Sequence, residues 1–158
     1  MPDATLAECL VEIHDGEVDL ASEVYELALL SIDEDRVWWR DLEHEVLMGE
    51  NIYERIFSEW SRISRGAFPA EGIHESWERE AGPVTVSFLL HGREHRLTTD
   101  MLEWIDLGLL DGVNRLIEST GYYFESDFAT GDQTACVMVL THAEKARIAD
   151  ERPLLFGA

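Results

Sequence analysis

The sequence predicts an α+β fold, in which a helical segment is followed by a strand-rich domain. Through residues 1–66, apolar residues recur every three or four positions, which is the spacing of one face of a helix. Beyond residue 66, β-branched and aromatic runs are separated by glycine and proline turns. A run of helices followed by a run of strands is typical of α+β proteins. We therefore expect an acidic helical segment at 1–66 and a strand-rich α+β domain at 67–158.

Four helices are expected in the helical segment, at residues 6–13, 20–30, 31–49 and 51–66. Ser31 is followed three positions later by Glu34, which is the pattern of a capping box at the start of the third helix. Trp38 and Trp39 are neighbours and would lie about 100° apart on that helix, so both cannot point to the centre of one core. One of the two is therefore expected to be exposed or to lie at an interface.

About five strands and two further helices are expected in the second segment, with the strands forming a mostly antiparallel sheet. His91-Gly92 separates two strand-like runs, which is the pattern of a β-hairpin. Thr141 and Glu144 repeat the capping-box pattern and open a short last helix that ends before Pro153. The strands are expected at 73–79, 83–90, 93–97, 122–128 and 134–140, and the other helix at 107–117.

The charge of the chain is strongly acidic and unevenly distributed. The 33 Asp and Glu against 12 Lys and Arg give a net charge of −21, and residues 1–59, with 17 acids and 3 bases, account for −14 of it. Nucleic acids and anionic lipids need a cationic face, so we expect no direct binding to nucleic acid or to a membrane. A basic protein partner is favoured instead. Adaptation to high salt is the alternative explanation of the acidic excess.

The remaining features of the sequence predict a cytoplasmic protein. Residues 1–10 have no basic region and no long apolar run, so we expect no secretory signal. No stretch approaches the apolar length of a membrane span. Cys9 and Cys136 are the only cysteines, and one possible pair is no disulfide framework.

The sequence carries no recognisable motif of catalysis or metal binding. His91 and His95 are four positions apart, but Gly92 places a turn between them, so they do not form the helical pair of zinc proteases. The chain has no Cys-x-x-Cys, no glycine-rich phosphate loop and no Gly-x-Ser-x-Gly. We therefore expect no metal, no cofactor and no enzymatic activity.

Ten residues of the helical segment form the candidate partner-binding site, because aromatic anchors surrounded by carboxylates are strong binding determinants. The alternative is a solvated helix face, on which Arg36 and Arg40 pair with neighbouring acids. The candidate residues are Asp33, Glu34, Asp35, Trp38, Trp39, Asp41, Glu43, Glu45, Glu50 and Glu54.

A second, smaller set of polar residues is a candidate site for a small ligand. The alternative is that these side chains satisfy turn backbone, as Asp, Asn and Thr do routinely. The set consists of Glu75, Asp106, Asn114, Asp132 and Gln133.

Five segments of the second half carry a resemblance to a recurrent, uncharacterised domain of bacterial proteins. They are RISRGAF (62–68), IHESW (73–77), GPVTVSF (82–88), WIDLGLLDGVNRLI (104–117) and DQTACVMVLTHAEKARI (132–148). The resemblance implies no known activity. In size and acidity the chain is similar in style to the immunity proteins that neutralise polymorphic toxins, which is an analogy without a shared motif.

The sequence therefore favours an acidic protein-binding module, an immunity or inhibitor-type protein that covers a basic partner such as a nucleic-acid-acting toxin. One alternative is a structural or assembly component of a bacterial complex or a homo-oligomer, in which the apolar tail Leu154-Leu155-Phe156 seals a subunit contact. Another is an enzyme whose site is assembled only in three dimensions, around Glu75, Asp106, Asn114 or Asp132.

Overall fold

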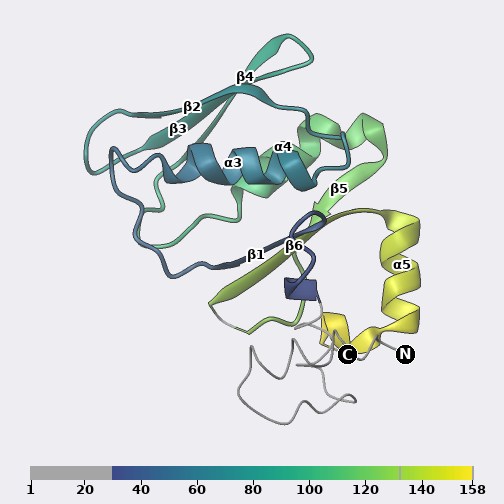
Figure 1. The fold of residues 1–158 in the computed structure, drawn as a ribbon. Coiled ribbons are helices and arrows are strands. Elements are labelled where there is room, and N and C mark those ends of the chain that lie inside the picture. Colours follow the sequence, from purple (N-terminus) through teal and green to yellow (C-terminus); the bar gives the residue numbers. More distant parts are fainter. Residues whose placement is uncertain (1–29, 132, 158) are drawn as a thin grey trace.

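The computed structural model describes residues 30–131 and 133–157 of the 158-residue chain. Its elements follow one another along the chain as shown in Figure 1. They are β1 (Val37–Asp41), α3 (Ile52–Ile63), β2 (Glu71–Trp77), β3 (Val84–Leu90), β4 (Arg93–Thr99), α4 (Leu109–Ile117), the 3₁₀ helix η1 (Glu118–Thr120), β5 (Tyr122–Glu125), β6 (Thr134–Thr141), α5 (His142–Glu151) and the 3₁₀ helix η2 (Pro153–Phe156).

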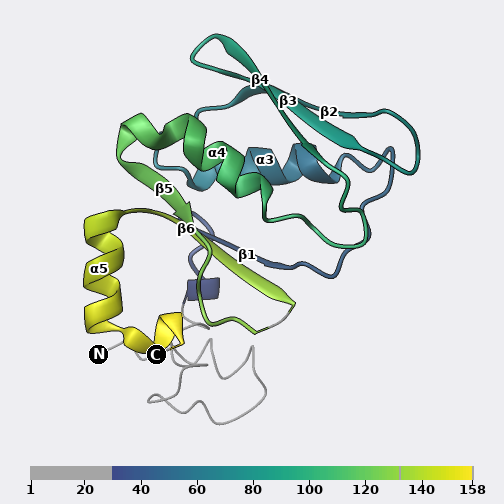
Figure 2. The same ribbon diagram turned by 180° about the vertical axis from the view of Figure 1, so that it is seen from behind.

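The strands form two antiparallel sheets on either side of a helical layer. Sheet A has the order β1-β6-β5, and sheet B has the order β2-β3-β4. Helices α3 and α4 lie between the two sheets, and α5 with η2 lies beyond sheet A (Figures 1 and 2). The chain therefore builds alternating layers of sheet and helix.

The main core lies where α3 meets both sheets. The helix turns its apolar positions inward at the spacing of one helix face, so that Tyr53, Phe57 and Trp60 are fully buried. Phe57 packs against Phe88 of sheet B with ring centroids 5.7 Å apart, and Trp60 packs against Phe124 of sheet A at 6.2 Å. Large buried side chains of this kind each stabilise the fold by roughly 1.5–3 kcal/mol.

The predicted helix at 31–49 is wrong, because Val37–Asp41 forms strand β1 and pairs with β6. The adjacent tryptophans explain the difference. In a strand, neighbours point to opposite faces, and Trp38 is accordingly 4% exposed while Trp39 is 37% exposed. A Val-Trp-Trp run also suits a strand better than a helix, provided that a partner strand is present.

The predicted arrangement of one five-stranded sheet behind four N-terminal helices is also wrong, although the structure is α+β. The second-half strands are divided between two three-stranded sheets, and β1 completes sheet A. Helix α3 occupies the expected position, and so do α4, α5 and the β3–β4 hairpin. The helices expected at 6–13 and 20–30 lie outside the described residues, apart from Leu30.

None of the helices within the described ranges combines the length and the apolar composition that crossing a lipid bilayer requires.

Candidate functional site

The ten candidate partner-binding residues lie on β1 and on the segments that flank it. Three form the turn before β1, three belong to β1, and the others lie along the connection to α3 or in its first turn. In that order they are Asp33, Glu34 and Asp35; Trp38, Trp39 and Asp41; Glu43, Glu45 and Glu50; and Glu54.

Trp38 belongs to the core and is no surface anchor. Its ring packs edge-on against Trp60 at 5.8 Å, and its indole nitrogen donates to the carboxylate of Glu59 at 2.7 Å. The Arg40 guanidinium donates to the same carboxylate at 2.6 Å and lies over the Trp38 ring. Glu59 of α3 was not singled out from the sequence. Arg40 is ion-paired with Glu59 and so leaves the candidate acids unpaired by it.

Most of the candidate carboxylates remain exposed and unneutralised. Asp33 is ion-paired with Arg36, and Glu54 is partly buried against β2. The other acids, at positions 34, 35, 41, 43, 45 and 50, are exposed. Residues 41–50 contain four of these acids and no Lys or Arg. The negative charge of this stretch is therefore not cancelled by any Lys or Arg within it, although His44 lies 4.0 Å from Glu50.

Exposed apolar side chains lie among these carboxylates. Two backbone bonds, Ile105 N to Leu42 O and Val46 N to Leu102 O, run residues 42–46 antiparallel to 102–105. Leu47 and Met101 each lie one residue beyond the Val46–Leu102 bond. Leu47, Met48 and Met101 are 45%, 53% and 46% exposed.

We call this region the acidic loop surface and define it as Asp41, Glu43, Glu45, Leu47, Met48, Glu50, Asp100, Met101 and Glu103. Large apolar side chains surrounded by charge on a surface mark sites of protein interaction. Sequence reasoning missed its apolar members because it placed Leu47 and Met48 in a helix, and because nothing local connects residue 101 with residue 47.

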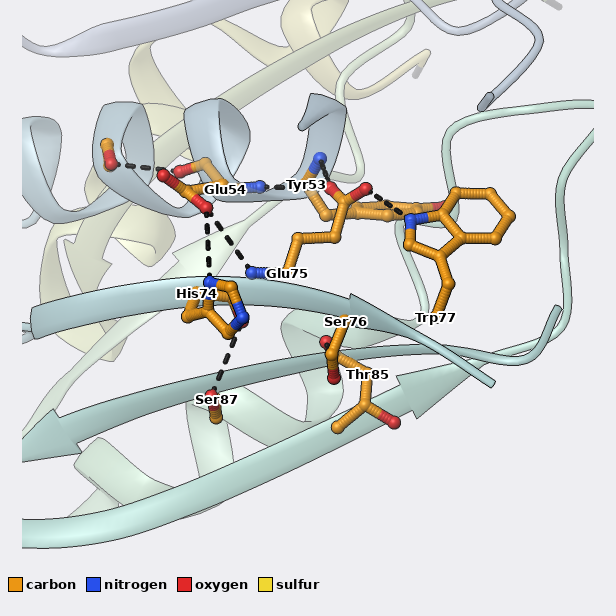
Figure 3. Close-up of polar contacts among 9 residues, drawn as sticks. Tyr53, Glu54, His74, Glu75, Ser76, Trp77, Thr85 and Ser87 are labelled. Atoms are coloured by element: carbon orange, nitrogen blue, oxygen red, sulfur yellow. Dashed lines mark hydrogen bonds and ion pairs between the residues drawn. The ribbon is translucent and has the colours of Figure 1, made fainter. Parts of the chain in front are cut away.

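Glu75 holds a structural position at the start of α3 (Figure 3). Its side chain is 5% exposed, and one carboxylate oxygen accepts the backbone N–H of Tyr53 at 2.7 Å and that of Glu54 at 3.3 Å. The other oxygen accepts the indole N–H of Trp77 at 2.7 Å. The Asn51 side chain makes no capping bond, so Glu75 supplies the cap of α3 from a different element.

Asp106 and Asn114 of the small polar set also satisfy backbone groups. Asp106 accepts Thr99 Oγ1 at 2.6 Å and the Gly108 backbone N–H at 2.8 Å. Asn114 donates to the Phe124 carbonyl at 3.0 Å and accepts its N–H at 2.7 Å.

Gln133 donates to Glu43, and Asp132 lies outside the described residues.

Tyr53 is hydrogen-bonded to both Glu75 and Asp106. Its backbone N–H meets Glu75, while its hydroxyl accepts the N–H of Asp106 at 3.0 Å. Burial raises the pKa of Tyr53 to about 12, so the phenol stays protonated. Glu75 and Asp106 are therefore connected by hydrogen bonds through the buried Tyr53 and do not line a common pocket between them.

A hollow of about 410 Å³ lies between β6 and α5. Its arginines at 36, 65 and 147 are each ion-paired with an acid. Neither Glu75 nor Asp106 lines this hollow. Within the described ranges, no three His, Cys, Asp or Glu side chains come close enough together to hold a metal ion.

The apolar tail packs on its own chain. Leu155 is buried in the cluster beneath sheet A, and the Phe156 ring stacks on Phe128 at 5.0 Å. The tail is therefore packed against its own chain and not left exposed for a subunit contact.

Comparison of the chain with protein-family models, with curated proteins and with solved structures gave no match, so the function has to be inferred from the molecule itself.

Proposed function

We propose that this chain is an acidic protein-binding module of the immunity or inhibitor type, which acts in the cytoplasm. It covers a basic partner, such as a nucleic-acid-acting toxin, with its acidic loop surface. The observation that carries the proposal is the composition of that surface: exposed Leu47, Met48 and Met101 lie among carboxylates, with no Lys or Arg between residues 41 and 50.

The physical chemistry of this surface suits a cationic protein. Carboxylates would take the place of phosphates in the partner's binding cleft, so association is fast and is screened by salt. The apolar side chains would supply the buried centre that charged groups alone do not provide, because exposed ion pairs contribute little net affinity. Charge therefore sets the rate and the choice of partner, while the apolar centre sets the lifetime of the complex.

A charge-matched pair of variants tests the proposal. In the surface variant, Glu43, Glu45 and Glu50 are replaced by Gln. In the control variant, Glu71→Gln, Glu118→Gln and Asp150→Asn remove the same charge from exposed positions elsewhere. Each tagged full chain is expressed in its own host, and co-purified proteins are identified by mass spectrometry. A basic protein should be captured by the wild type and by the control, and should be lost from the surface variant.

The purified partner then allows a kinetic test. Raising the salt concentration from 0.05 to 0.5 M should slow association by about tenfold or more, since exposed charges are screened over a few ångströms at high salt. Equal capture by both variants, or a rate that salt does not change, would contradict the proposal.

A further inference from the structure

The sheet edges of this protein differ in how they are protected. A bare strand edge exposes unpaired backbone N–H and C=O groups and is a template for another strand. On β5, Asn114 occupies both backbone groups of Phe124. On β2, the Glu54 carboxylate accepts the Glu75 backbone N–H, and the register shifts between Glu71 and His74. On β4, exposed Arg93, Glu94 and Arg96 supply charge.

Strand β1 is the remaining edge, and its outward groups follow from its pairing with β6. Leu42 N donates to Gln133 O, in the same register that places Trp39 opposite Cys136. Hydrogen-bonded positions alternate in an antiparallel ladder, so residues 38, 40 and 42 face β6, and 37, 39 and 41 face away. Val37 N accordingly bonds outward, to Asp33 O. Within the described residues, nothing accepts the backbone N–H groups of Trp39 and Asp41.

A hollow runs along this edge. It measures about 310 Å³ and is lined by β1, by Ser31 and Glu34 before it, and by Glu59 and Arg62 of α3. Trp39, 37% exposed, forms part of its wall. Residues 37–40 of β1 therefore border a concave space, and Asp41 lies just beyond it.

The charge beside β1 favours a basic strand as its neighbour. Arg36 and Arg40 are ion-paired with Asp33 and Glu59. Glu34, Asp35, Asp41 and Glu43 are exposed at the two ends of the strand, and Arg62 is the further base among the described residues that line the hollow.

Trp39 and Asp41 point to the same face of β1, where alternate residues of an added strand would meet an aromatic ring and a carboxylate. Arginine and lysine satisfy both groups.

We propose that β1 accepts an extended, arginine- or lysine-rich segment of a protein partner, which adds to sheet A as a fourth strand. The inference rests on the proposed function and names the form in which the basic partner binds: main-chain hydrogen bonds to Trp39 and Asp41 hold the segment, and the flanking carboxylates select its charge. A second copy of this chain is disfavoured, because antiparallel pairing of two β1 strands about Trp39 would place Asp35 opposite Glu43.

Binding of designed peptides to the full chain tests this inference. The probe is a ten-residue peptide of alternating arginine and valine, capped at both ends. One copy carries glutamate in place of arginine, and a second copy has every backbone nitrogen methylated, which keeps the charge and removes the donors. The probe should bind, and both copies should bind about tenfold more weakly or not at all, because one loses the charge and the other loses several hydrogen bonds.

Amide exchange by NMR locates the bound peptide. In the free chain, the N–H groups of Trp39 and Asp41 should exchange much faster than that of Arg40, which faces β6. The peptide should slow exchange at 39 and 41 by about tenfold or more. Trp39→Pro removes the outward N–H and should abolish peptide binding, while the fold should survive because an edge strand tolerates proline at such a position. Trp39→Val keeps the N–H and should retain the part of the binding that depends on main-chain hydrogen bonds.

Several results would overturn the inference. The first is failure of the probe to bind, and the second is equal binding of the methylated copy. The third is slow exchange of the Trp39 and Asp41 amides in the free chain, whether its own residues protect them or a second copy does, which light scattering would detect. If the methylated copy binds equally and both peptides are lost from the Glu43, Glu45 and Glu50 variant, the proposed function stands and only the strand addition fails. If neither charge nor that variant matters, the proposed function fails too.

Discussion

The Glu75 carboxylate accepts the backbone N–H of Tyr53 at 2.7 Å, so that β2 caps the first turn of α3. The two residues come from different elements, and the bond is buried. Because α3 lies between the two sheets, this contact ties its first turn to sheet B while its buried face packs against both sheets. It also gives Glu75 a structural task in place of the ligand-binding task expected from the sequence.

Replacing Glu75 should destabilise the fold strongly. Glu75→Ala leaves the N–H groups of Tyr53, Glu54 and Trp77 without their acceptor, and we expect the free energy of unfolding to fall by about 3 kcal/mol. Glu75→Gln keeps one acceptor oxygen and should cost less. Urea denaturation measures both. Glu71→Ala, exposed on the same strand, should change stability by less than about 0.5 kcal/mol, and an effect as large as that of Glu75→Ala would refute this assignment.

The two adjacent tryptophans should respond differently to the same substitution. Trp38→Phe removes the indole donor to Glu59 from a buried position and should cost about 1–3 kcal/mol. Trp39→Phe changes a half-exposed side chain and should cost less than about 0.5 kcal/mol. Thermal unfolding followed by circular dichroism compares them. Equal losses would be inconsistent with the alternation of strand β1.

Glu125 should make stability depend on pH in the acid range. Burial alone would raise its pKa, but hydrogen bonds from Lys145, from the Asp127 backbone N–H and from Tyr123 outweigh burial and lower the pKa below the ordinary value of 4.5. The folded state thus binds this proton less readily than the unfolded state. The stabilisation is complete above the unfolded pKa and is lost as pH falls through the folded pKa.

Glu125→Gln should therefore be less stable than the wild type at pH 7, by about 2 kcal/mol, because hydrogen bonds to a charged group are lost. The difference should narrow as pH falls below 4.5. Urea titrations over a pH series measure it, with exposed Glu118→Gln as the control. A difference that stays constant down to pH 3 would show that the ionised carboxylate contributes nothing.

The Cys136 thiol should be inert in the folded protein. It is buried in β6, and burial raises its pKa to about 12, so almost no thiolate forms at neutral pH. Alkylation with iodoacetamide, read by peptide mass spectrometry, should modify Cys136 only in denaturant. Cys9 is read from a separate peptide and does not interfere. Rapid modification of Cys136 in native buffer would mean that sheet A opens readily.

Local signals in the sequence predicted the elements whose causes are local. The capping box of Thr141 and Glu144 forms as expected, with both of its hydrogen bonds present. The hairpin at His91-Gly92 forms with both residues at positive φ, as a two-residue turn of this kind requires. Helix α3 begins at Ile52 and ends at Ile63, within the expected range.

Features that depend on distant partners could not be read from local patterns. Val37–Asp41 becomes a strand because β6 lies beside it, which the helical periodicity did not predict. The expectation that one of the two tryptophans is exposed is confirmed, since Trp39 is 37% exposed, but it is the alternation of a strand that separates them. The exposed carboxylates at 43, 45 and 50 were anticipated from composition, but the approach of the segments that carry Leu47 and Met101 depends on a backbone bond between residues 46 and 102. Glu75 could not be assigned as a cap because its helix lies 22 residues earlier.

The pairing of β1 with β6 has a consequence for biosynthesis. The partner residues Trp39 and Cys136 are far apart along the chain, so a nascent polypeptide displays its Val-Trp-Trp stretch until the region around Thr134–Thr141 has left the ribosome. Until then this stretch is a natural recognition site for chaperones. No incomplete chain can therefore present β1 as the edge of a formed sheet A.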